Sequence, residues 1–197
     1  SFAIVTFIIN QLLGGMIGGP GGGPPVIPPC VNCGSLGGGI IESVYPAPGA
    51  RDVPRNTNIA VTFKEVMKPS SIIAGASDTC TFANPCTGDL AVDASGRPNV
   101  KIYKSQEGES LALVANEVIV ITTDRKTFTF NPKQYLGDGQ SNWWYSTKLD
   151  SGILRANGQP AFSGLGYFIW SFEIGTRLDL EPPKVINVFP IPDNEAD

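Results

Sequence analysis

Apolar and polar residues alternate in short stretches through the middle of the chain, with turn residues between the stretches. The alternation is clearest in residues 127–130 and 167–174, where every second side chain is aromatic or aliphatic. This period of two predicts strands that bury one face. The predicted strands are residues 41–45, 58–63, 99–104, 111–114, 117–122, 127–130, 143–149 and 167–174. Seven or eight short strands predict an all-β fold, a sandwich spanning residues 40–178.

Turn and loop signals separate the predicted strands. Turns are predicted at Pro48-Gly49, Asp138-Gly139 and Asn157-Gly158 because glycine and asparagine tolerate the backbone conformations of tight turns. Residues 68–98 lose the strand pattern and are rich in Ser, Ala, Gly and Asp. We therefore expect an inserted loop there. A loop of this length inside a compact domain is normally functional or disordered, unless a disulfide cross-links it.

The chain opens with an uncharged apolar run, residues 2–17, that precedes the predicted sandwich. Ten large side chains make it apolar: Phe2, Ile4, Val5, Phe7, Ile8, Ile9, Leu12, Leu13, Met16 and Ile17. At about 1.5–3 kcal/mol each, leaving them in water would cost roughly 15–30 kcal/mol. The run needs an apolar environment, which could be copies of itself, a bilayer or the core of its own domain.

Length and flanking residues discriminate between these environments. The run has no basic region before it and is followed by glycines, so it is a poor match to a signal peptide. As a helix it would reach about 25 Å, less than the roughly 30 Å of a bilayer core. We expect a helix that packs against its own copies in an assembly. The alternatives are a membrane anchor over residues 2–18 and a strand donated into a neighbouring sandwich.

Residues 19–39 are rich in Gly and Pro and predict a linker between the apolar run and the sandwich. The chain has four cysteines in two close pairs, Cys30 with Cys33 and Cys80 with Cys86. Close, even pairing favours two disulfides and an oxidising, extracellular or cell-surface compartment. A zinc site is the alternative, but the second pair is spaced too widely and the chain has no His.

Composition excludes several function classes. A net charge of −4 without a basic stripe argues against a nucleic-acid partner. The absence of His excludes Ser-His-Asp and Cys-His catalysis, so we expect a non-enzymatic protein without cofactor or metal. Three carboxylates, Asp138, Asp150 and Glu173, could approach one another near one end of the sandwich, although solvated turn and strand positions explain them more simply.

Trp144 is the one residue of the sandwich that the pattern singles out as a surface contact. It faces away from Trp143 and Tyr145 on the same predicted strand, so at least one of these rings should be partly exposed. Core packing explains such aromatic residues in most strands. An exposed Trp144 would instead mark a contact with a subunit or ligand.

Residues 44–63 read Val-Tyr-Pro-Ala-Pro-Gly-Ala-Arg-Asp-Val-Pro-Arg-Asn-Thr-Asn-Ile-Ala-Val-Thr-Phe. This block resembles the opening of the bacterial Ig-like domain first named from S-layer proteins, P-x-x-G-x-x-x-V-P-x-N-T-x-I-x-V-T-F. Shorter matches follow at residues 64–67, 127–132, 152–158 and 172–174, so the resemblance covers about residues 41–176. It implies a spacer or binding module of secreted or surface proteins, without catalytic residues. The apolar run resembles a pilin-type assembly segment only loosely, because it lacks the early glutamate.

The opening strand has a second copy near the end of the chain. Residues 185–192, Val-Ile-Asn-Val-Phe-Pro-Ile-Pro, repeat residues 41–48 with the apolar positions and both prolines in register. The repeat predicts a strand that begins a further Ig-like domain or pairs with an adjacent subunit through Val185, Val188 and Phe189. We therefore expect residues 179–197 to be a hinge and first strand, and the whole chain to be a homopolymeric filament or surface-lattice subunit. A membrane-anchored adhesin-like stalk whose Ig-like domain binds a glycan or protein is the alternative.

Overall fold

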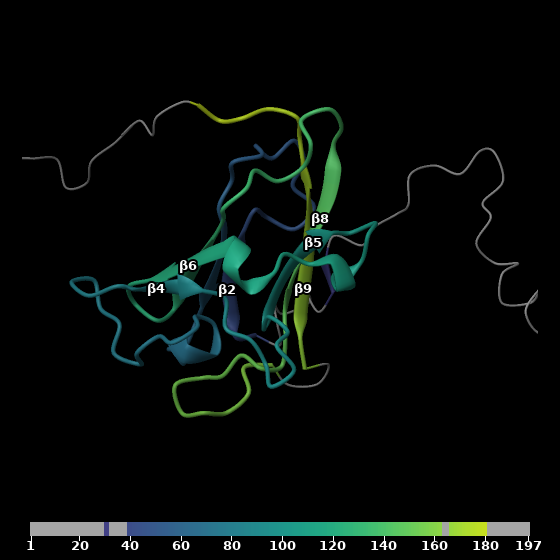
Figure 1. Ribbon diagram of the computed structural model, residues 1–197. Coiled ribbons are helices and arrows are strands. Elements are labelled where there is room, and N and C mark those ends of the chain that lie inside the picture. Colours follow the sequence, from purple (N-terminus) through teal and green to yellow (C-terminus); the bar gives the residue numbers. More distant parts are fainter. Residues whose placement is uncertain (1–29, 32–38, 163–165, 181–197) are drawn as a thin grey trace, which may run out of the picture.

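Nine strands form two antiparallel sheets in the computed structural model, which describes residues 30–31, 39–162 and 166–180 (Figure 1). Sheet A has the order β1 (Cys30–Val31), β9 (Phe168–Ile174), β8 (Trp143–Leu149) and β5 (Val100–Lys104). Sheet B has the order β2 (Ile41–Tyr45), β3 (Ile59–Phe63), β7 (Thr127–Pro132), β6 (Val118–Thr122) and β4 (Cys86–Asp89). The all-β sandwich predicted from the alternating pattern is confirmed.

The core lies between the two sheets because the alternating side chains point inward from both. On β9, Phe168, Trp170, Phe172 and Ile174 are fully buried, while the residues between them face outward. Trp170 donates from its indole nitrogen to the Pro46 carbonyl oxygen at 3.0 Å. Sheet A also buries Val100, Ile102 and Leu149 completely. Further large side chains that are fully buried come from sheet B, from Met67 and from the insertion: Ile41, Ile59, Phe63, Met67, Ile72, Ile73, Leu90, Phe128 and Phe130.

Most predicted strands are confirmed, but residues 111–114 are not a strand. Leu111 ends the 3₁₀ turn η3 (Glu109–Leu111), and residues 112–114 connect it to a second 3₁₀ turn, η4 (Ala115–Glu117). Leu111 and Val114 are exposed, and only Leu113 packs against the core, from where its amide donates to the Ile102 carbonyl. The apolar pattern was misleading there because one side chain, Leu113, is partly buried, rather than a whole strand face being buried.

The predicted inserted loop, residues 68–98, contains more structure than its sequence pattern indicated. It begins with the 3₁₀ turn η2 (Pro69–Ser71), places Ile72, Ile73 and Leu90 in the core and supplies β4, which pairs with β6. Edge strand β4 was missed because its residues, Cys-Thr-Gly-Asp, have no alternating apolar face.

The free side of β9 is covered by two separate segments. Cys30 and Val31, which the sequence placed in the linker, pair with Trp170 and Ile169 as β1. Further along, the Gly49 amide donates to Ser171, and Val53 exchanges backbone contacts with the Glu173–Ile174 end of the strand. A sheet edge covered in this way does not offer its backbone to other chains.

Several predictions fall outside the described residues. The helix over the apolar run, the pairing of Cys30 with Cys33 and the strand over residues 185–191 therefore stay predictions. The three predicted turns are confirmed: Gly49, Gly139 and Gly158 all have positive φ angles.

Candidate functional site

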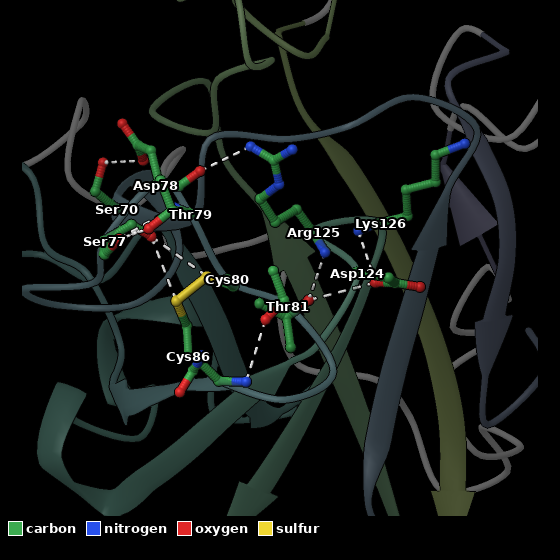
Figure 2. Close-up of a disulfide and its surroundings, with 12 residues drawn as sticks. Ser70, Ser77, Asp78, Thr79, Cys80, Thr81, Cys86, Asp124, Arg125 and Lys126 are labelled. Carbon is green, nitrogen blue, oxygen red and sulfur yellow. Dashed lines mark hydrogen bonds between the residues drawn. A yellow bond between two sulfur atoms is a disulfide. The ribbon is translucent and has the colours of Figure 1, made fainter.

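The most distinctive exposed feature is a disulfide-closed loop that leads into β4 (Figure 2). Cys80 and Cys86 form the predicted disulfide, with their Cα atoms 5.2 Å apart. Inside the loop, the Thr81 amide donates to the Asn84 carbonyl at 3.0 Å, and the Asn84 amide donates back to the Thr81 hydroxyl at 3.2 Å. The covalent bond and these hydrogen bonds give the loop a single preformed turn.

The loop is held against the turn that joins β6 to β7. Arg125, in the left-handed region at φ 60°, donates from its guanidinium to the Asp78 carbonyl at 2.7 Å (Figure 2). The Asp124 carboxylate fixes this turn by accepting from the amides of Lys126 and Thr127 at 2.8 and 2.7 Å. Partial burial would raise the pKa of Asp124, but these amide hydrogen bonds outweigh it and lower the pKa.

Phe82 stands at the tip of this preformed loop and is 90% exposed. Burying a phenylalanine ring is more favourable than leaving it in water by about 1.5–3 kcal/mol. A partner that covered Phe82 would gain this free energy. Because the loop is already ordered, binding through Phe82 would require little further loss of conformational freedom. The sequence did not identify this residue, since the exposure of a loop side chain depends on how the insertion folds.

Removing the disulfide by the double substitution Cys80→Ser and Cys86→Ser should lower the free energy of unfolding by about 2 kcal/mol, following the chain-entropy estimate for a loop of this length. Intact-mass analysis of the unmodified chain under non-reducing conditions should find both thiols unavailable to alkylation. Chemical denaturation of the variant measures the loss. Alkylation of Cys80 or Cys86 without reduction would contradict the prediction.

A groove with two adjoining hollows, of about 320 and 310 Å³, lies beside β5. Both hollows are lined by Arg97, Pro98, Lys101 and Glu109. Ala112, Leu113 and Val114 form the apolar wall of the second hollow. The charged side chains that line the groove determine what chemistry it can offer.

The charged side chains that line this groove are already paired with one another. Lys101 contacts Asp150 at 2.7 Å, Lys148 contacts Glu109 at 2.8 Å, and Arg97 contacts Asp93 at 2.9 Å. Burial acts to lower the pKa of Lys148, but its hydrogen bond to Glu109 and the charge of Asp150 outweigh it and raise the pKa. Lys148 therefore stays protonated near neutral pH and cannot serve as a general base there.

The three candidate carboxylates do not meet. Asp138 and Glu173 lie near the start of β8, whereas Asp150 follows its other end and pairs with Lys101. The Asp138 carboxylate accepts hydrogen bonds from the amides of Ser141 and Gln140 and from the Trp143 indole, which lower its pKa to about 2. Seven residues of strand separate the two ends, and this distance excludes a shared acid-base or metal site.

Trp144 lies on the outer face of sheet A and is partly exposed. The Arg51 guanidinium carbon sits 5.7 Å from its ring centroid, in the range of a cation–π contact. Part of the ring is thus engaged by its own chain. A contact between Trp144 and a subunit or ligand stays a prediction.

The chain is pinned where it leaves the sandwich, by contacts we call the exit clasp, residues 52–56 against 175–179. Asn56 and Asp179 exchange two hydrogen bonds of 2.7 and 2.9 Å, and the Arg55 amide donates to the Arg177 carbonyl at 3.0 Å. Arg177 also forms an ion pair with Asp52 at 3.2 Å. The clasp gives a physical role to the Val-Pro-x-Asn-Thr motif, since Asn56 of that motif makes two of its bonds.

Neither a metal cluster nor a membrane span is found in the part of the chain that the structure describes. No group of three or more potential metal ligands occurs within residues 30–31, 39–162 and 166–180. No helix among these residues is long and apolar enough to cross a bilayer.

Comparison with known families agrees with this architecture. The family model of the bacterial Ig-like domain matches residues 40–174, which include every strand of the described sandwich from β2 to β9. Neither the curated proteins nor the solved structures contain a match. The match spans more than half of the chain, and domains of this family are typical of bacterial surface proteins and typically non-catalytic. The chain belongs to the bacterial Ig-like domain family.

Proposed function

We propose that this protein is a non-enzymatic structural subunit of an extracellular filament or surface lattice, assembled through residues 2–17 and presenting its Ig-like sandwich outward. The observation that carries the proposal is the packed core of the described sandwich. Its buried apolar side chains come from residues 40–174. Ten apolar side chains of the N-terminal run still require an apolar environment, and copies of the same run would provide one.

The Gly/Pro-rich residues 19–29 support this arrangement, because they can separate a packed assembly centre from the sandwich. The disulfide-closed loop suits a module exposed outside the cell, because disulfides persist in an oxidising environment. The covered edge of β9 suits such a module as well, because an uncovered sheet edge can pair with other chains and aggregate.

Sedimentation velocity of the full chain, with and without detergent, tests the proposal. Large particles in plain buffer, persisting on dilution, are expected from assembly through residues 2–17. Single chains that stay in solution only with detergent would instead support the membrane-anchored alternative. Soluble monomers without detergent would contradict both.

The exit clasp favours an ordered partner for the second copy of the opening strand. Because residues 175–179 are fixed against residues 52–56, whatever follows leaves the sandwich from a defined point. The first copy, residues 41–45, is edge strand β2, which pairs with β3 and is followed by the turn at Gly49. We infer that residues 184–191 take the equivalent position in a following domain or an adjacent subunit.

Val188→Asp should weaken head-to-tail association while leaving the stability of the sandwich nearly unchanged, because it introduces a charge into the predicted apolar strand, whose residues are not among those of the described core. The measurement is the concentration dependence of sedimentation, together with thermal unfolding, for residues 40–197. Asn187→Asp is the control, since it adds the same charge at a position that is already polar. If Val188→Asp unfolds the sandwich in a monomeric preparation, the strand belongs to the sandwich of residues 40–178 and not to a following domain or another subunit.

A second candidate function is the adhesin-like stalk, in which the sandwich itself binds a glycan or protein. Phe82 favours it, because an almost fully exposed ring on a preformed loop is typical of a contact residue. Phe82→Ala should lower affinity about tenfold or more for any glycan that the full chain binds on a glycan array. Tyr135→Ala, another exposed aromatic, is the matched control. Equal effects of the two substitutions would argue against this role of Phe82.

A further inference from the structure

The outer face of sheet B has no charged side chain in its central row. Strand register places five outward-facing residues side by side across all five strands of the sheet: Thr87, Ile121, Thr129, Ala60 and Tyr45. The neighbouring rows are Asp89, Ile119 and Asn131 on one side, and Thr127, Thr62 and Ser43 on the other. Asp89, on edge strand β4, is the charged member of these two rows. Ile121 is 41% exposed and Tyr45 is 55% exposed, so the row reaches solvent.

Charged residues stand at the margins of this face. Asp89 and Lys133 pair at the β4 edge at 3.3 Å, and Glu42 lies in the opposite edge strand. The outer face of sheet A differs, since its inner strands β8 and β9 carry Lys148 and Glu173. An uncharged centre with a charged rim is the pattern of a protein contact surface.

We propose that the outer face of sheet B packs against the same face of a second copy of this chain. Hydroxyl groups both donate and accept hydrogen bonds, so a face rich in Thr is complementary to itself. The uncharged central row also meets its copy without like-charge repulsion. Thr62 and Thr127 already show this pairing within the sheet, where their hydroxyl oxygens lie 3.3 Å apart. Ile121 and Tyr45 would supply the apolar area.

The size of the face determines how strong this contact can be. Five strands about 4.8 Å apart and about five residues long, at 3.3 Å per residue, give roughly 400 Å² per copy. Stable complexes bury about 800 Å² per partner, so free sandwiches would associate only weakly. Chains already held together through residues 2–17 would associate far more readily, because tethering raises the effective concentration. The expected strength of this contact therefore rests on the proposed function, because it assumes chains tethered through residues 2–17. The composition of the face does not depend on that function.

Cross-linking of the full chain tests the proposal. Thr129→Cys places a thiol on central strand β7, in the middle of the uncharged row. A bis-maleimide with a spacer of about 10 Å matches the separation of two packed sheets. Leu111→Cys is the matched control, because Leu111 is 64% exposed and lies away from sheet B. The unsubstituted chain measures any background from Cys30 and Cys33.

Cross-linked dimers should form with about tenfold higher yield at position 129 than at position 111 when chains are tethered. Adding Ile121→Lys to the Thr129→Cys chain should lower that yield, because it places a charge in each copy of the face. Equal yields at the two positions, or no effect of Ile121→Lys, would overturn the proposal.

Sedimentation of the same samples separates this outcome from the fate of the proposed function. Large particles without preferential cross-linking at position 129 would refute the face while leaving assembly through residues 2–17 intact. Preferential cross-linking in samples without large particles would support the face and refute that assembly. The absence of both large particles and preferential cross-linking would refute both proposals.

Discussion

Removal of residues 1–18 is expected to convert the large particles of the full chain into a soluble, folded monomer. The deletion removes the ten apolar side chains whose exposure would cost roughly 15–30 kcal/mol, and with them the reason to assemble. It leaves the described core complete, because that core is built from residues 40–174. Sedimentation velocity and far-ultraviolet circular dichroism measure the two parts of this prediction.

Two substitutions in the full chain complement the deletion. Leu12→Glu with Leu13→Glu places charges inside the apolar run and should weaken assembly without shortening the chain. Thr6→Ser keeps the run uncharged and is the matched control. Particles of full size after the deletion would show that another part of the chain assembles it.

Trp170→Ala is expected to lower the free energy of unfolding by about 3–5 kcal/mol, the usual range for a large aromatic in a packed core. Trp170 is fully buried, stacks on Phe168 with ring centroids 5.5 Å apart, and donates to the Pro46 carbonyl. The substitution leaves a cavity and an unpaired carbonyl oxygen. It also weakens the packing between β9 and the segment that crosses from sheet B.

Chemical denaturation of the chain lacking residues 1–18, followed by circular dichroism, measures this loss. Trp170→Phe should show a smaller loss, because it retains most of the packed area but not the indole hydrogen bond. Phe82→Ala is the control, and since Phe82 is exposed its effect should stay within about 0.5 kcal/mol. Equal losses for Trp170→Ala and Phe82→Ala would contradict the assigned core.

Strands with one buried face were predictable from the sequence. Residues 143–149 and 41–45 were predicted with the bounds that β8 and β2 have, because half-buried strands show their alternation directly. Strand β4 was not predictable in this way, since an edge strand held by backbone bonds to β6 and by a disulfide needs no apolar face. Residues 111–114 show the reverse, an apolar stretch that is mostly exposed.

The candidate site was predictable only in part. The spacing of Cys80 and Cys86 indicated their disulfide, but the exposure of Phe82 between them depends on how the insertion packs against Arg125. Asp138 and Asp150 are near in sequence yet lie at opposite ends of β8. The uncharged central row of sheet B required the register of five strands, which the sequence pattern does not fix.

Negative-stain imaging of the full chain purified without detergent tests the central claim most directly. Assembly through residues 2–17 predicts filaments or sheets whose surface carries sandwich-sized projections, and it predicts that these particles are absent after deletion of residues 1–18. Fields of isolated sandwich-sized particles from the full chain would contradict the claim.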